Sequence, residues 1–241
     1  MGLLNKLRVA YDRQVGPPAI GRAGAPAHTA SQQRGPALAP RGGRPSNGLK
    51  DFLWQLDGTV HGNLLDLGPV WQATVGFFVE RGFKVYTEDL LSGWKEFLRA
   101  EEDRLRAQPP DKPSPEISPA ERAERFLRES LQYPADSFHA VLIWDLLDYM
   151  DIELVARVVA RLTDLLKRGG VILAVFHSRK PEGFHRYRVL DPQNLELLPT
   201  APLFPPQRIY QNREILNLFS RFHTSKTFVG RDQLREGLFV K

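Results

Sequence analysis

The chain of 241 residues contains no cysteine. Disulfides, thiolate nucleophiles and sulfur-ligated metals are therefore excluded, and the composition suits a reducing compartment, so we predict a cytoplasmic protein. Long apolar runs are missing too. Stretches such as Val171–Phe176 are far shorter than the roughly 20 residues that a transmembrane helix needs, and we predict no transmembrane segment. Neither a phosphate-binding Gly-rich loop nor a serine nucleophile elbow is present, which argues against P-loop nucleotidases and α/β-hydrolases.

The net charge of +5 is unevenly distributed along the chain. Residues 1–50 hold eight lysines and arginines against one acid, Asp12, so they carry +7 and the remainder carries −2. Residues 14–48 are rich in Gly, Pro, Ala and Arg, and such a segment buries too little apolar surface to offset the entropy of ordering it. We predict a basic disordered leader over residues 1–46 and a folded domain over 47–241.

Two interpretations of the leader stay open. Leu3, Leu4, Leu7 and Tyr11 fall near one face of a short predicted helix at its start. The leader is either a solvated tether or a segment that binds a membrane surface or a partner. Its arginines are not interleaved with aromatic residues, so the sequence carries no strong nucleic-acid signal.

From Asn47 onward, helix-like and strand-like segments alternate. Apolar runs predict buried strands at 63–67, 83–87, 140–144 and 171–176. Helical spacing predicts helices that begin near residues 47, 70, 90, 119, 152 and 212. Asn47, Ser118 and Asp151 are expected to cap the first, fourth and fifth of them. This alternation predicts an α/β fold with a doubly wound, mostly parallel sheet. Residues 223–229 and 237–241 are joined by a link so short that they must pair antiparallel, as a C-terminal hairpin.

Ligands of open parallel sheets bind beyond the carboxyl ends of the strands, near the point where strand order reverses. Three predicted strand ends carry polar residues there. Asp66-Leu67-Gly68 precedes a helix, and its glycine allows a tight turn and close approach of a ligand. Glu88-Asp89 follows the second strand and is suited to accept the hydroxyls of a ribose. Residues 144–149, Trp-Asp-Leu-Leu-Asp-Tyr, follow a third strand.

Four segments in order give the chain a family resemblance. Asn63–Pro69, Glu80–Val85, Tyr133–Val141 and Leu165–Leu173 are similar to the first motif, the entry to strand two, the loop before strand four and the entry to strand five of the class I S-adenosylmethionine-dependent methyltransferases. The closing hairpin is similar to the antiparallel seventh strand of that family. The resemblance covers roughly residues 60–241.

The resemblance implies S-adenosylmethionine as cofactor and methyl transfer to an unidentified acceptor. The cofactor-binding residues that it implies are Asp66, Gly68, Glu88, Asp89, Trp144 and Asp145. Candidates for a catalytic role are Asp145, Tyr149 and His177. We expect the acceptor to bind among residues 93–130 and 178–212, whose aromatic and basic side chains include Trp94, Phe184, Arg186, Tyr187, Arg188 and Tyr210. His177 and His185 lack the further ligands that a metal site needs, and we predict none.

The chain also departs from the family pattern. Val70 and Gln72 stand where the family keeps two further glycines, and His139 replaces the aspartate before strand four. Residues 121–131 have the pattern of a helix where strand three is expected. These departures support an alternative: a catalytically inactive binding or scaffold module with the same fold, tethered through its basic leader. In structural terms, Asp66 would then cap a helix and Trp144 would be a core aromatic.

Overall fold

Seven strands form the main sheet of the protein. Their bounds in the computed structural model are β1 (Val9–Tyr11), β3 (Asn63–Asp66), β4 (Lys84–Thr87), β5 (Phe138–Trp144), β6 (Leu166–His177), β9 (Thr224–Val229) and β10 (Leu234–Val240). They lie in the order β1-β4-β3-β5-β6-β10-β9. The structure describes residues 9–11, 43–109, 117–230 and 232–241.

The strand directions confirm the predicted mostly parallel sheet. β4, β3, β5 and β6 run parallel to one another, and the strand order reverses between β3 and β5. β10 lies antiparallel between β6 and β9, with Leu234 opposite His177 and Val240 opposite Val171. The predicted C-terminal hairpin is therefore confirmed, and its last strand is inserted into the sheet instead of extending it.

The outer position beside β4 is filled by the start of the chain. Val9–Tyr11 pairs antiparallel with β4, Val9 lying opposite Thr87. The prediction of a short helix over residues 3–11 is therefore wrong for its last three residues. They form a strand because the open edge of β4 offers partners for their backbone groups. The rest of that helix, and most of the leader, lies outside the described residues. Where strand three was expected, the predicted helix is confirmed as α4 (Pro119–Glu129).

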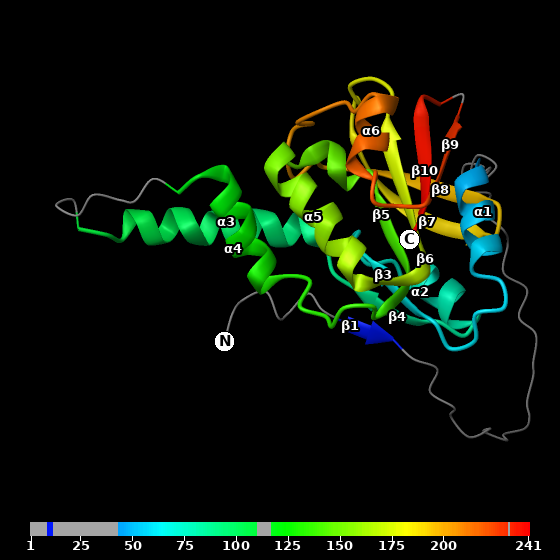
Figure 1. Cartoon of the computed structure of the whole chain (residues 1–241). Coiled ribbons are helices and arrows are strands. Elements are labelled where there is room, and N and C mark those ends of the chain that lie inside the picture. Colours follow the sequence, from blue (N-terminus) through cyan, green and yellow to red (C-terminus); the bar gives the residue numbers. More distant parts are fainter. Residues whose placement is uncertain (1–8, 12–42, 110–116, 231) are drawn as a thin grey trace, which may run out of the picture.

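Helices cover both faces of the sheet (Figure 1). Besides α4, the helices are α1 (Asn47–Gln55), α2 (Gln72–Val79), α3 (Leu90–Arg106), α5 (Ile152–Leu165) and α6 (Asn212–Leu218), and a 3₁₀ turn lies at Leu146–Tyr149. Ser118 and Asp151 accept hydrogen bonds from the third backbone N–H after them and cap α4 and α5, as predicted. α1 begins at Asn47 and is capped by Ser46, so the cap lies one residue earlier than the expected cap, Asn47.

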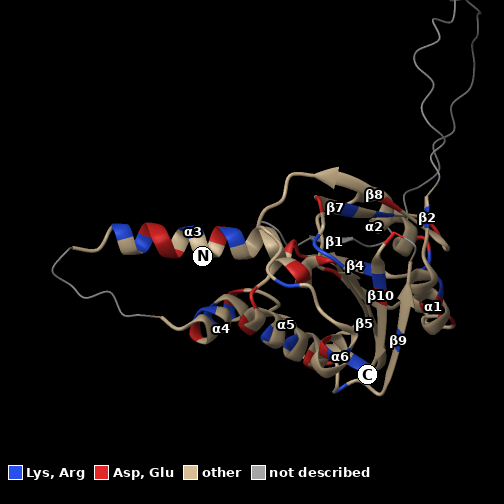
Figure 2. Ribbon diagram, turned by 90° about the horizontal axis from the view of Figure 1, so that it is seen from above, with Lys and Arg blue, Asp and Glu red and all other residues tan. Residues whose placement is uncertain are grey.

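The apolar core lies in two layers. Leucines and valines of α5 and Ile215 of α6 pack on one face of the sheet, and leucine, valine and phenylalanine side chains of α1 and α2 pack on the other. α3 and α4 lie side by side and extend away from the sheet (Figure 2). Trp94 stacks on Phe97 and meets Phe126 edge-on between these two helices. Trp94 is thus a core residue and not the acceptor-lining aromatic that we expected.

A second sheet of three strands lies beside the first. It consists of β2 (Arg44–Pro45), β8 (Asn194–Thr200) and β7 (Phe184–Asp191), in the order β2-β8-β7. Tyr187 and Val189 of β7 and Leu195 of β8 join the core layer of α1 and α2. β7 also contacts α2, where the Val189 N–H donates to the hydroxyl of Thr74. None of the helices in the described ranges is long and apolar enough to span a membrane.

Candidate functional site

Asp66 ends β3 at the point where the strand order reverses. Its Oδ1 accepts a hydrogen bond from the Gly68 N–H at 3.0 Å and another from the indole Nε1–H of Trp144 at 2.8 Å. The residue is only 2% exposed. One carboxylate thereby joins the turn after β3 to the end of β5, so the acidic-x-Gly motif is tied to the neighbouring strand.

Burial raises the pKa of Asp66 to about 7, although its two hydrogen bonds oppose the shift. Because this value exceeds the ordinary 3.8, the folded protein binds the proton more tightly than the unfolded chain does. The stability that Asp66 contributes is therefore complete below pH 4 and is lost as the pH rises through 7. We expect Asp66→Asn to be more stable than the wild type at pH 8 and the difference to shrink steadily towards pH 4. Urea denaturation at a series of pH values measures it. Exposed Asp57→Asn is the control, and an equal pH dependence in both variants would contradict the prediction.

The space beside Gly68 is occupied by Trp144. A Cβ atom on Gly68 would lie 2.5 Å from Cδ1 of this indole. The indole stacks on the ring of Tyr187, with centroids 5.3 Å apart and an interplanar angle of 8°. Trp144 also has a left-handed backbone, φ 57°, which is unusual for a large side chain. The end of β5 thus lays an aromatic ring over the glycine turn, and β7 holds it there.

Glu88 and Asp89 lie at the adjacent end of β4 but serve local structure. The Glu88 carboxylate accepts from the Leu131 N–H at 2.9 Å, and Asp89 caps α3 by accepting from the Ser92 N–H at 3.0 Å. The Glu88 N–H donates to the backbone oxygen of Asp66, so the two strand ends do meet.

The residue types at this strand end suit an adenosyl group, but the space that such a group would need is filled. The turn, the acids and the start of α2 are present, yet the indole of Trp144 fills the volume beside Gly68. Val70 is 36% exposed and Gln72 is exposed, so neither of these substituted glycine positions blocks the turn. The space is closed by Trp144 and Tyr187, whose contact no sequence pattern indicated.

A second polar cluster lies at the ends of β5 and β6. Oδ2 of Asp148 accepts from the backbone N–H of His177 at 2.7 Å and lies 2.8 Å from its Nδ1. On the other side of the imidazole, Oδ2 of Asp145 is 3.7 Å from Nε2. Both aspartates are fully buried and His177 is 6% exposed. The edge of the Tyr149 ring packs against both His177 and Phe184.

Burial dominates the electrostatics of this cluster. It raises the pKa of Asp145 to about 7 and also raises the pKa of Asp148, while the neighbouring His177 opposes both shifts. The pKa of Tyr187 lies well above 10, because the phenol is buried and faces Asp145. Within the described ranges, neither carboxylate oxygen of Asp145 has a hydrogen bond of good geometry. A buried carboxyl group without partners carries a cost in stability and is a mark of functional sites.

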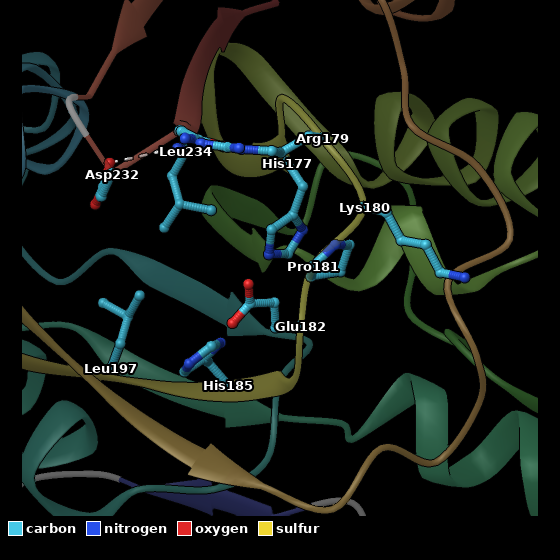
Figure 3. A pocket seen from close by; sticks show the side chains of 10 residues that line it. His177, Arg179, Lys180, Pro181, Glu182, His185, Leu197, Asp232 and Leu234 are labelled. Atoms are coloured by element: carbon cyan, nitrogen blue, oxygen red, sulfur yellow. Dashed lines mark hydrogen bonds between the residues drawn. The ribbon is translucent and has the colours of Figure 1, made fainter.

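His177 reaches a cavity of about 420 Å³ beyond the end of β6. Polar side chains around it come from the loop after β6, from β7 and from the start of β10 (Figure 3). They include His177, Arg179, Lys180, Glu182, His185 and Asp232. No group of three metal-ligating side chains occurs in the part of the chain that the structure describes.

The structure brings together some of the residues singled out from the sequence and separates others. Asp145, Tyr149 and His177 lie in one cluster. Asp66 and Trp144 touch, whereas Arg186 stacks on Trp71 at the outer side of β7. Asp148, the partner of His177, was among the polar residues noted at 144–149 in the sequence but was not selected as a site residue. Its spacing of three from Asp145, directly after a strand, was the available signal.

Comparisons with known proteins reach solved structures only; no family model and no curated protein sequence matches the chain. One similar structure is the 1,6-didemethyltoxoflavin-N1-methyltransferase of Burkholderia thailandensis with bound S-adenosylhomocysteine, at 15% identity and a TM-score of 0.43, covering 81% of this chain and 78% of that one. Another is an S-adenosylmethionine-dependent methyltransferase from Mesorhizobium loti, at 14% identity and a TM-score of 0.40, covering 79% and 96%. A glycopeptide N-methyltransferase complexed with S-adenosylmethionine has 15% identity and a TM-score of 0.38, with 85% and 99% covered.

Likeness at this level carries no argument about activity. The assignment of the fold rests on the sheet itself: four parallel strands with an order reversal between β3 and β5, and an antiparallel strand inserted before the last one. By that order and those directions, the chain has the class I methyltransferase fold.

Proposed function

We propose that this protein is an S-adenosylmethionine-dependent methyltransferase whose cofactor site is closed by Trp144 when empty. The observation that carries the proposal is the Asp66-Leu67-Gly68 turn, which lies where the strand order reverses, with Glu88 and Asp89 at the adjacent strand end. This is where open parallel sheets bind their ligands.

The residues proposed to bind the cofactor share this sheet edge; they are Asp66, Gly68, Glu88, Asp89 and Asp145. Trp144, which the family resemblance also implied as a binding residue, is proposed instead as the ring that closes the site. S-adenosylmethionine would supply the methyl group. The protein would align the acceptor and exclude water, and positioning of this kind contributes much of the rate in such displacements. Of the three catalytic candidates, His177 is the proposed proton acceptor, because its ring borders a cavity and Asp148 fixes its orientation. Asp145 and Tyr149 would position that ring.

Binding requires the indole of Trp144 to leave Gly68. The left-handed backbone of Trp144 carries strain of the order of 1 kcal/mol or more, which movement of the residue would release. A second candidate function competes with this one. If the indole never moves, the closed turn favours a non-catalytic binding or scaffold module with the same fold.

Titration calorimetry with S-adenosylhomocysteine distinguishes the two candidates. Trp144→Ala removes the closing ring, and we expect it to bind the ligand at least tenfold more tightly than the wild type, about 1.4 kcal/mol. Trp144→Phe is the gentler variant if alanine unfolds the protein. Trp54→Ala is the matched control, because Trp54 is 69% exposed on α1. Absence of binding to the wild type and both Trp144 variants, with either S-adenosylhomocysteine or S-adenosylmethionine, would support the scaffold function.

A further inference from the structure

The cavity beyond β6 has the size and lining of a small-molecule site. Its volume of about 420 Å³ lies within the range of roughly 300–1,000 Å³ that is typical of ligand pockets. Pro181, Leu197 and Leu234 give it apolar walls, and the other lining residues are polar and come from the loop after β6, from β7 and from the turn before β10. Polar groups that converge from different elements beside apolar walls can fix the orientation of a small organic molecule.

His177 lies at the floor of the cavity, and its ring is a hydrogen-bond acceptor whose orientation is fixed by Asp148. Asp148 fixes the His177 ring through Nδ1, so Nε2 is the nitrogen left for other groups. Asp145 lies beneath it, fully buried, with its Oδ2 3.7 Å from Nε2 and with the phenol of Tyr187 facing it. A ligand hydroxyl could donate a hydrogen bond to the His177 ring. Because the ring is already oriented, binding would lose little further side-chain entropy.

Side chains of both charges lie at the rim of the cavity. Arg179 lies across the top towards Leu234, whereas the neighbouring Lys180 points away (Figure 3). Among the acids, Asp232 is already paired with Arg44. Glu182 points between His177 and His185 from the exposed loop after β6.

The rim of the cavity therefore carries one cation, Arg179, at the top and one carboxylate, Glu182, on the loop after β6. A compact anion would pair with Arg179, and the Glu182 carboxylate, which also lines the cavity, would have to move aside. A planar carboxylate is also the partner that a guanidinium holds best, through two parallel hydrogen bonds.

We propose that this cavity binds a small hydroxyl-bearing carboxylate, with Arg179 holding the carboxylate and His177 accepting the hydrogen bond of the hydroxyl. The site is built from the loop after β6, from β7 and from β10, and it does not include the Asp66 turn. Binding therefore stands apart from the cofactor proposal. Only the further role of the ligand as methyl acceptor rests on the proposed function.

The first test measures binding to the full chain without any adenosyl compound, with 4-hydroxybenzoate as the probe. Titration calorimetry is expected to show binding that Arg179→Ala weakens at least tenfold. Lys180→Ala is the matched control, since it removes the same charge from the next residue, and it should leave the affinity unchanged. Glu182→Gln should strengthen binding several-fold, because it removes a like charge from the site.

The second test needs no variant and separates the two ends of the probe. The wild type should prefer 4-hydroxybenzoate to benzoate, which lacks the hydroxyl, and to 4-hydroxybenzamidine, which carries a cation instead of the carboxylate. The proposal is overturned if 4-hydroxybenzoate does not bind, if the benzamidine binds more tightly, or if Lys180→Ala weakens binding as much as Arg179→Ala. None of these results depends on the adenosyl ligand, so failure here and failure of the cofactor proposal are distinguishable.

Discussion

Replacing Asp148 by alanine is expected to destabilise the protein by about 2 to 6 kcal/mol, because each of the two buried hydrogen bonds that it loses costs roughly 1 to 3 kcal/mol when a partner is left unsatisfied. The Asp148 carboxylate accepts from the backbone N–H of His177 and orients its ring, and both groups are buried. Alanine would leave the buried backbone N–H and the Nδ1 of His177 without these partners. Urea denaturation at pH 7 measures the loss as a lower midpoint with an unchanged m value.

A conservative variant and a surface control test the same contact. Asp148→Asn keeps an oxygen for the backbone N–H and should retain part of the lost stability. Asp164→Ala is the control, because Asp164 lies half-exposed on α5 in a loose pair with Arg221, and such surface pairs contribute little. An Asp148→Ala protein within 1 kcal/mol of the wild type would show that solvent replaces the carboxylate and that the cluster is not sealed.

Arg44→Ala should have an effect of similar size, about 3 to 5 kcal/mol. Arg44 joins β2 to the C-terminal hairpin through Asp232 and Glu236. Glu236 is 2% exposed and also accepts from the Gly48 N–H at 2.6 Å. Without Arg44, a buried carboxylate would keep a single backbone donor. Thermal unfolding measures the effect.

The control for Arg44 is Lys50→Ala, which removes the same charge from an exposed position on α1. The pair variant Arg44→Ala with Glu236→Gln should regain part of the stability, because the unpaired charge is then gone. Equal loss from Lys50→Ala would mean that net charge matters and the buried pair does not. Deleting residues 1–46 to test the leader would remove Arg44 and Ser46 as well, so a deletion that tests the leader alone must keep both.

Much of the main sheet followed from local patterns in the sequence. The apolar runs at β3, β5 and β6 have no polar face, since helices cover both sides of the sheet, and that made them recognisable. The caps at Ser118 and Asp151 are side-chain contacts with residues three positions on, and short-range contacts of this kind can be inferred from sequence. The helix in place of strand three was predicted for the same reason.

The second sheet was missed although part of its signal was present. Around Asp191-Pro192-Gln193-Asn194, which forms a tight turn, apolar residues such as Tyr187, Val189, Leu195 and Leu197 recur at every second position. That pattern is typical of a hairpin. β1 and β2 carried no such signal. Each is two or three residues long, and each is a strand only because a distant edge accepts it.

The candidate site was predictable only in part. The sequence placed Asp66 and Gly68 at the reversal of strand order, which the sheet confirms. It did not indicate that the Trp144 side chain would fold back over Gly68, because that depends on a left-handed residue and on Tyr187 from a sheet that was not predicted. The aspartates around His177 were visible as residues, but their pairing is set by how β5 and β6 end side by side.

The pairing of β1 and β2 has a consequence for biosynthesis. Val9–Tyr11 leaves the ribosome early but has no partner until Lys84–Thr87 follows, and Arg44–Pro45 must wait for Asn194–Thr200. Pairings so distant in the chain slow folding, and unpaired strand edges invite association with other nascent chains in the meantime. Arg44–Pro45 in particular, although made early, can pair only after most of the chain has been synthesised.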